Sequence, residues 1–241
     1  MLNAASRFLL IRYQVRRSLG ASLILQINPQ SVLRFAGSNQ PMTLQIRHRI
    51  TAWEEAFPAS TPALRFFQKC LYSIEPFCLL DNAFSQGIAI EDEERYLLIQ
   101  DFISNRANIA ASRWYKHLVN MLLTKGFASH KAIRMHSEDD IAKFLQSYVG
   151  GMVESLENTG YDSSRASDVG TAFVDADGSI HKCDAGNHRF SAARILGVAP
   201  VPVEILGVHR DWYQSQVGHG GTAALKHALA RVEAAHQGGR G

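Results

Sequence analysis

The sequence predicts an α+β protein: a helical N-terminal region, then a compact unit of the order βαββαβ, then a C-terminal helix. Two observations lead to this prediction. Apolar residues recur at helical spacing through much of residues 54–128. After residue 129, short apolar runs typical of strands alternate with helical patterns and turn residues. We therefore divide the chain into a basic segment 1–53, a helical accessory region 54–128, an α+β domain 129–211 and a C-terminal helix and tail 212–241.

The composition is that of a folded globular protein. Of its 241 residues, 46% are hydrophobic and 20% are charged, which excludes a disordered or fibrous chain. No apolar run reaches the about 18 residues that a transmembrane helix needs. Cys70, Cys78 and Cys183 are too few and too scattered to form a disulfide framework or a zinc site. We therefore expect a cytoplasmic protein and no metal site built from cysteines.

The first 53 residues carry seven arginines, no lysine and no acid. Three interpretations stay open. The segment is a helix whose arginines are solvated or pair with the acidic run at 91–94, or it lies on an anionic membrane surface, or it is a cleaved targeting segment. A nucleic-acid-binding arm is less favoured, because no recognisable reading module accompanies the arginines.

The region 54–128 reads as a series of helices without a catalytic signature. Leu98 and Phe102 lie on one side of a predicted helix, and Gly126 is a natural end for another. Trp114 and Tyr115 are most simply core residues. This region is therefore predicted to be accessory.

The α+β domain begins with a predicted strand at 132–135. Ser137 is a plausible N-cap, because acidic residues follow it in the first turn of a long helix that ends at Gly160. A β-hairpin is then predicted from strands 171–174 and 179–183 around the turn 175–178. A helix at 187–196, closed by Gly197, a strand at 201–206 and a helix at 222–236 complete the predicted order.

A sharp turn between the second hairpin strand and the helix at 187–196 carries the chemistry. The backbone N–H groups at a helix N-terminus favour an anion, and Gly186 lets a phosphate approach the backbone. Arg189 can add a bidentate contact to that anion. We therefore predict a phosphate site made by Gly186, Asn187, His188 and Arg189. The structural alternatives are that His188 caps or packs and that Arg189 pairs with Asp184.

This turn resembles the signature of the ParB/sulfiredoxin-like superfamily, in which a Gly-x-[His/Arg]-Arg turn opens an alanine-rich helix. The resemblance covers roughly residues 130–208. Further features follow the order of the family: Glu154-Ser155-Leu156, Gly160-Tyr161, Asp177-Gly178, Ile195-Leu196-Gly197 and Val201-Pro202-Val203.

The resemblance implies binding of a nucleoside triphosphate at the turn. Members of the superfamily use it for a CTP-operated DNA clamp, for ATP-dependent repair of oxidised cysteine or for phosphorylation of free serine. Sulfiredoxins carry cysteine directly after the glycine, where this chain has Asn187, and Cys183 lies earlier, on the predicted strand. After Asp211 there is room for one helix only, so a helix-turn-helix domain and sequence-specific DNA binding are not expected.

What remains is phosphotransfer to a small hydroxylated metabolite, or nucleotide hydrolysis, with ATP or CTP and Mg²⁺. Asp184, and Glu138 as a second candidate, would serve as catalytic base or metal ligand. His130 and Lys131, before the first strand, and His209, after the last, are candidates to line the site if these strand ends converge. Ser191 and Arg194 are expected on the helix surface. The competing hypothesis is a non-catalytic module that senses a nucleotide or phosphate and is peripheral to a membrane.

Overall fold

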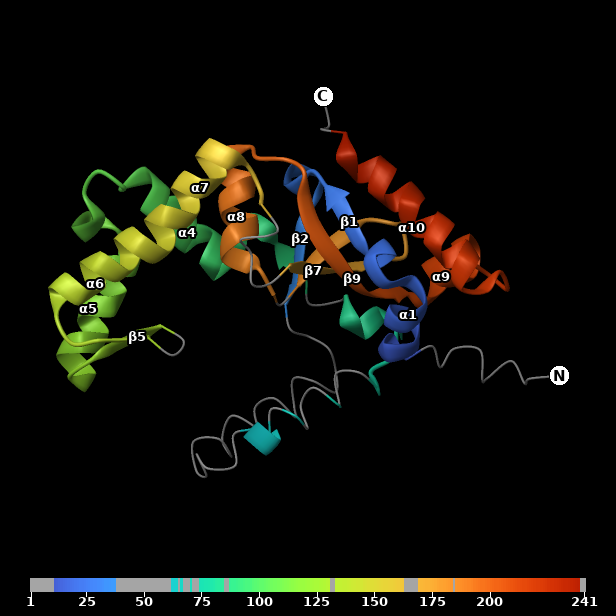
Figure 1. Ribbon diagram of the computed structural model, residues 1–241, viewed down its shortest axis with the longest axis horizontal. Helices are drawn as coiled ribbons and strands as arrows, with labels where there is room; N and C mark the ends of the chain where they lie inside the picture. The colour runs from blue at the N-terminus through green and yellow to red at the C-terminus, as the bar shows by residue number, and fades with distance from the viewer. Residues whose placement is uncertain are drawn as a thin grey trace.

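A mixed β-sheet forms the centre of the structure (Figure 1). The computed structural model describes residues 11–37, 62–64, 66, 70, 74–84, 87–130, 133–162, 169–183 and 185–238. Seven strands within these ranges belong to the sheet, in the order β1-β9-β7-β8-β2-β4, with β3 paired to the C-terminal end of β9. The strands are β1 (Ile24–Ile27), β2 (Arg34–Gly37), β3 (Cys78–Leu79), β4 (Ile88–Ala89), β7 (Gly170–Val174), β8 (Ile180–Cys183) and β9 (Val201–His209).

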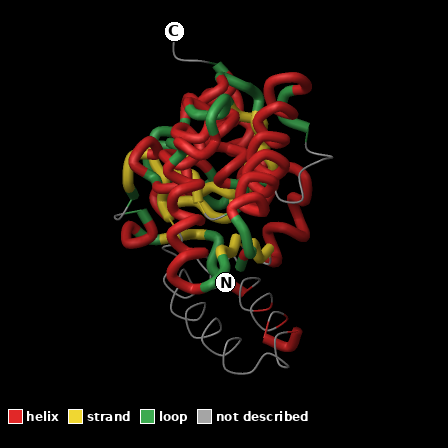
Figure 2. Tube along the Cα trace, turned by 90° about the vertical axis from the view of Figure 1, so that its left-hand side faces the viewer, coloured by secondary structure: helices red, strands yellow, loops and turns green. Residues whose placement is uncertain are grey.

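Helices pack on both sides of this sheet. Figure 1 shows α4, α7 and α8 on one side and α1, α9 and α10 on the other, and in the turned view of Figure 2 the strands lie among helices. The helices are α1 (Arg12–Leu19), α4 (Glu94–Ser104), α5 (Arg113–Lys125), α6 (Glu138–Phe144), α7 (Gly151–Thr159), α8 (Asn187–Leu196), α9 (Arg210–Gln216) and α10 (Gly221–Gln237). Short 3₁₀ turns are η2 (Gly20–Leu23), η3 (Pro29–Ser31), η5 (Asp81–Ala83), η6 (Ile90–Asp92) and η7 (Ile109–Ala111).

Local signals fix several helix ends as the sequence predicts. The Ser137 hydroxyl accepts a hydrogen bond from the Asp140 backbone N–H at 3.1 Å and so caps α6. From there the helix runs through a π-helical turn, η8 (Leu145–Gly150), into α7 and stops at Gly160. Gly126 and Gly197 end α5 and α8 in the left-handed conformation, which glycine adopts without strain.

The predicted hairpin, the helix after it and the strand that follows are confirmed. β7 and β8 pair antiparallel, α8 begins at Asn187, and β9 returns parallel to β7. Trp114 is 3% exposed and belongs to the core, as expected. The α+β class is thus confirmed as a mixed sheet covered by helices.

The sheet also contains strands that the sequence analysis did not predict. β1 and β2 come from the basic segment, and β3 and β4 come from the region expected to be entirely helical. Conversely, the strand expected at 132–135 is observed as β6 (Ile133–Met135), but it pairs only with β5 (Ala128–His130) in a separate two-stranded sheet. Strands of two to four residues are too short for periodicity to reveal them, and their partners lie far away in the sequence.

The expectation that Ser191 and Arg194 lie on the surface of α8 is wrong. Ser191 is 3% exposed and Arg194 is 6% exposed, because α4, α7 and η3 pack around this helix. The Arg194 guanidinium pairs with Glu91 and donates a hydrogen bond of 2.5 Å to the Pro29 carbonyl. Arg194 therefore ties α8 to two other segments.

Candidate functional site

The turn before α8 depends on a close contact between two glycines. Gly186 has a φ of +72° and occupies the N-cap position of α8. A Cβ atom at Gly186 would lie 2.8 Å from the Cα of Gly170, at the start of β7. No described side chain caps this helix end, whose first intrahelical bond runs from the Phe190 N–H to the Gly186 carbonyl. The turn thus leaves backbone donors of the first helical turn directed away from the helix.

Lys182 lies directly beneath the turn and was not singled out from the sequence. Its side chain is buried, with 1% of the residue exposed. The ammonium donates to the carbonyls of Cys183 and Ala185 and, over 2.6 Å, to Oδ1 of Asn187. A buried lysine needs such acceptors, because the desolvation of an ammonium is costly. The structure buries every position of β8, although its sequence, Ile-His-Lys-Cys, is not a continuous apolar run.

Thr171 closes the turn from the neighbouring strand. Its hydroxyl donates to the Cys183 carbonyl over 3.1 Å and accepts from the Ala185 N–H over 2.9 Å. The backbone conformation before α8 is therefore held by a strand that precedes it by more than ten residues.

Asn187 is the described residue of the turn that points most directly to a ligand. It is 7% exposed, and its Oδ1 accepts the bond from Lys182. Its amide Nδ2 is buried and has no hydrogen-bond partner within the described chain. Because buried polar groups are nearly always paired, this donor is suited to a bound acceptor.

Arg189 lies on the first turn of α8 and contacts an aromatic ring. The guanidinium carbon lies 5.6 Å from the centre of the Tyr161 ring, a cation–π contact. Among the described residues, no carboxylate pairs with Arg189, and the side chain is half-buried. The alternative pairing with Asp184 lies outside the described residues.

His188 packs among rings. Its ring centre lies 5.2 Å from that of Trp114 and 5.6 Å from that of His130. Tyr148 stacks on Phe144 and contacts both histidines. The structure therefore brings His130, one of the predicted lining residues, to the candidate site, within an aromatic cluster of Trp114, His130, Phe144, Tyr148 and His188.

Glu138 is bound by a tyrosine of α5. The Tyr115 hydroxyl donates to its carboxylate over 2.8 Å, and this bond raises the pKa of Tyr115. Figure 1 shows α6, which Glu138 opens, beside α5 and away from the main sheet. The helix of Glu138 packs on α5, whose Trp114 contacts His188, and the catalytic role of Glu138 stays a prediction. Asp184 and Lys131 lie outside the described residues.

His209 lies at the opposite edge of the sheet, so the expected convergence with His130 is wrong. Val203 pairs with Gly170 near the turn, and His209 is six residues further along β9, about 20 Å at the rise of an extended strand. Its Nδ1 accepts from the Asp211 N–H, so Nε2 carries the proton and donates to Asp81 over 2.9 Å. Asp81, His209 and Asp211 lie close enough to hold a metal ion, but both ring nitrogens of His209 are engaged in these hydrogen bonds.

Two of the described cysteines, Cys78 and Cys183, are buried and unsuited to redox chemistry, whereas Cys70 is exposed. Cys183 is 1% exposed on β8, and its thiol contacts the Thr171 hydroxyl. Burial raises the pKa of Cys78 to about 11, which keeps the thiol protonated. Neither residue offers an accessible thiolate.

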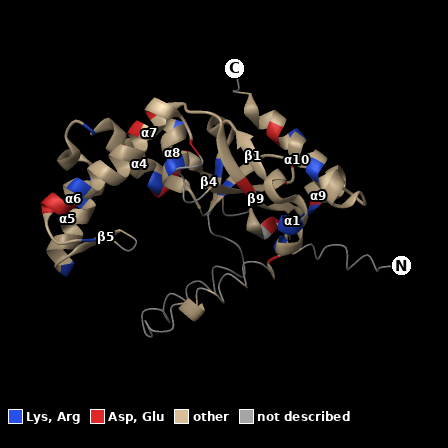
Figure 3. Ribbon diagram, viewed as in Figure 1, with Lys and Arg blue, Asp and Glu red and all other residues tan. Residues whose placement is uncertain are grey.

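The basic N-terminal segment is partly used within the fold. Arg12 is buried and pairs with Glu75 at 2.5 Å, and Arg16 forms two bonds to Glu204 at 2.6 and 2.8 Å. Arg12 and Arg16 thus pair with carboxylates outside the acidic run at 91–94 that the sequence analysis named. Arg7, Arg47 and Arg49 lie outside the described residues. Figure 3 shows the described basic residues spread over several elements. No helix among the described residues is long and apolar enough to span a membrane.

Comparison with known proteins gave no match: no protein-family model, curated protein or solved structure resembles this chain significantly.

Proposed function

We propose that the turn from Ala185 to Arg189 binds the phosphates of a nucleoside triphosphate, as the resemblance of its sequence to the ParB/sulfiredoxin-like superfamily implies. The observation that carries this proposal is the buried, unpaired Nδ2 of Asn187 at the N-terminus of α8. A phosphate oxygen placed there would accept from Nδ2 and from the backbone N–H groups of the first turn.

The electrostatics around the turn favour an anion. The α8 dipole places partial positive charge at its N-terminus, and Lys182 places an ammonium directly below it. Arg189, on the first turn, adds a guanidinium that no described carboxylate neutralises. A negatively charged ligand is thus the class best matched to this site.

We further propose phosphotransfer to a small hydroxylated molecule, with Asp184 as the base or the Mg²⁺ ligand. The substrate hydroxyl gives its proton to the carboxylate, its oxygen attacks the γ-phosphorus, and the nucleoside diphosphate leaves. Gly186, Asn187 and Arg189 hold the phosphates during this step. A bound Mg²⁺ ion would supply charge neutralisation between the β- and γ-phosphates.

One observation favours a second candidate, a nucleotide-sensing module without turnover. Two carboxylates were proposed for catalysis, and only Glu138 lies within the described residues. Its carboxylate accepts a hydrogen bond from Tyr115 on α5. If Asp184 contributes no chemistry, the site binds a nucleotide and nothing more.

Isothermal titration with ATP and with CTP, each with Mg²⁺, tests the binding proposal. Arg189→Ala should weaken binding of the preferred nucleotide about ten- to a hundredfold, because a hydrogen bond to a charged group contributes about 1.5 to 3 kcal/mol. Arg113→Ala is the matched control, an exposed arginine in the first turn of α5. Undetectable binding by the wild type, or equal affinity of both variants, would refute the site.

Asp184→Asn separates the two candidate functions. Loss of product formation at unchanged nucleotide affinity supports phosphotransfer. If no product forms even with the wild type, while binding persists, the sensing module is the correct function.

A further inference from the structure

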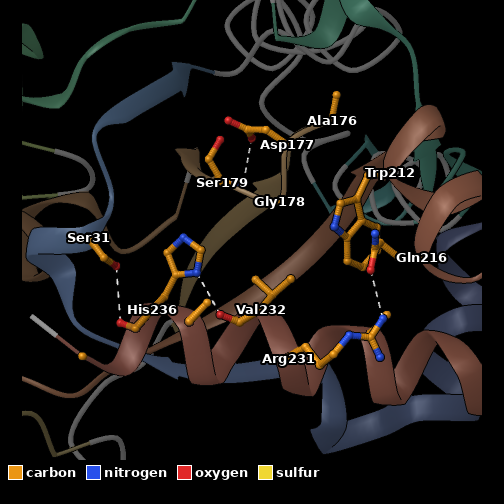
Figure 4. Close-up of a pocket in the computed structure, with 13 residues that line it drawn as sticks. Ser31, Ala176, Asp177, Gly178, Ser179, Trp212, Gln216, Arg231, Val232 and His236 are labelled. Carbon is orange, nitrogen blue, oxygen red and sulfur yellow. Dashed lines mark hydrogen bonds between the residues drawn. The ribbon is translucent and has the colours of Figure 1, made fainter. Parts of the chain in front are cut away.

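A cavity of about 460 Å³ opens at the edge of the sheet opposite the α8 turn (Figure 4). It lies between the β7–β8 hairpin turn, α9, α10 and η3. The hairpin turn follows Val174 at the end of β7, whereas Gly186 contacts Gly170 at the beginning of that strand. The volume falls in the range of small-molecule sites, about 300 to 1,000 Å³.

Trp212 presents an indole donor to the cavity. The residue is 4% exposed and lines the cavity, and its indole Nε1 makes no hydrogen bond within the described chain. A Cβ atom at Gly178 would lie 3.4 Å from Nε1, so the absence of a side chain at Gly178 leaves this ring edge open. In Figure 4 the nitrogen is on the side of the ring that faces the cavity. An indole N–H that faces a cavity and has no partner in the described chain can donate to a ligand oxygen.

Arg231 lies on the same side of the cavity as Trp212 (Figure 4). Its Nη2 donates to the neutral Oε1 of Gln216 over 3.0 Å, and no carboxylate among the described residues pairs with it. A guanidinium and an indole N–H on one wall are suited to a carboxylate.

The opposite wall of the cavity carries hydrogen-bond acceptors, from Asp177 and His236. Hydrogen bonding by Ser179 lowers the pKa of Asp177, so this carboxylate is ionised at neutral pH. The His236 Nδ1 donates to the Val232 carbonyl over 2.8 Å, which leaves Nε2 as an acceptor. Figure 4 shows this second nitrogen directed toward Ser179. An anionic oxygen and a ring lone pair are suited to an ammonium group.

From this arrangement we propose that the cavity binds a small zwitterion of the amino-acid or dipeptide class. Its carboxylate lies at Arg231 and Trp212, and its ammonium lies at Asp177 and His236. Ala228, Val232 and Ala235 supply apolar surface between the two walls. This site is separate from the proposed nucleotide site and does not depend on it.

Titration calorimetry on the full chain tests the proposal, with the common L-amino acids and alanyl-alanine as probes. The best probe should bind saturably, and its N-acetylated and C-amidated derivatives should each bind at least about tenfold more weakly, because each loses one charge-assisted contact. Arg231→Ala should weaken binding to a similar extent. Lys226→Ala is the matched control, an exposed cation on α10 that does not line the cavity.

Ala235→Trp provides an independent block, because Ala235 is exposed at the cavity and a tryptophan there fits without disturbing the core. It should abolish binding while circular dichroism shows a folded protein. The proposal is overturned if no probe binds the wild type up to about 10 mM, well above the weakest specific affinities. It is equally overturned if binding survives Ala235→Trp or is the same for Arg231→Ala and Lys226→Ala.

Discussion

Replacing Lys182 by methionine tests whether the buried ammonium organises the turn before α8. Methionine keeps most of the length and apolar stem of lysine and removes only the charged donor. Among the described residues, three oxygens lose a hydrogen bond in this variant, those of Cys183, Ala185 and Asn187. The consequences for these three oxygens differ.

The magnitude follows from the remaining partners of each oxygen. The Cys183 carbonyl keeps its bond from the Thr171 hydroxyl, and the Ala185 carbonyl keeps its bond from the Thr171 N–H at 3.3 Å. Oδ1 of Asn187 keeps no partner among the described residues. A buried acceptor left unsatisfied costs about 1 to 3 kcal/mol, so we expect Lys182→Met to lower the free energy of unfolding by about 2 kcal/mol.

A double-mutant cycle isolates this cost. Asn187→Ala removes the orphaned oxygen, so Lys182→Met should cost about 1 to 3 kcal/mol less in the Asn187→Ala background than in the wild type. Urea unfolding followed by circular dichroism measures all four proteins. Additivity of the two single changes within about 0.5 kcal/mol would show that Lys182 and Asn187 do not interact as the structure indicates.

Three further predictions follow from other described residues. Gly186→Ala should destabilise the fold by at least about 1 kcal/mol more than Gly197→Ala, since both positions have positive φ but only Gly186 meets a neighbouring backbone; equal shifts in urea unfolding would contradict this. Arg12→Met should cost about 3 to 5 kcal/mol, because it removes the cation of a buried ion pair with Glu75. Arg16→Met breaks a more exposed pair and should cost about 1 kcal/mol or less in the same assay; the reverse order would refute the assignment. Burial lowers the pKa of His181, and the charge of Arg34 adds to this effect while those of Asp175 and Asp177 oppose it, so the unfolded state binds the proton more readily. The free energy of unfolding should therefore decrease as pH falls through about 6.5. His181→Gln should flatten the dependence of this free energy on pH between about pH 7.5 and about pH 5.5, and an unchanged dependence would exclude His181 as its source.

The elements that the sequence predicts well are those with local signals. Ser137 and Gly160 mark the two ends of one long helical segment, and Gly197 ends α8, because caps and left-handed stops depend on neighbouring residues. The hairpin turn at Asp177 and Gly178 is local in the same sense. Such signals need no knowledge of the remaining chain.

The elements missed are those that depend on distant partners. β3 is two residues long and is a strand only because it pairs with the end of β9, and β1 pairs with the beginning of the same strand. Arg194 looked like a surface residue because its partners, Glu91 and the Pro29 carbonyl, are far away in the sequence. Helical periodicity places a side chain on a face of its helix but does not tell which other elements cover that face.

The candidate phosphate site likewise combines residues with local sequence signals and residues that depend on distant partners. Gly186, Asn187 and Arg189 were identified from the sequence, because a glycine before a helix N-terminus is a local pattern with a local chemical meaning. The groups that hold this turn, Thr171 and the Gly170 backbone, belong to another strand, and the place of Glu138 depends on how α6 packs. The residues of the proposed anion site could therefore be named from the sequence, whereas the strand that supports them and the packing of Glu138 could not. Phosphate binding is accordingly the part of the proposed function that the described residues support most directly, and turnover depends on Asp184.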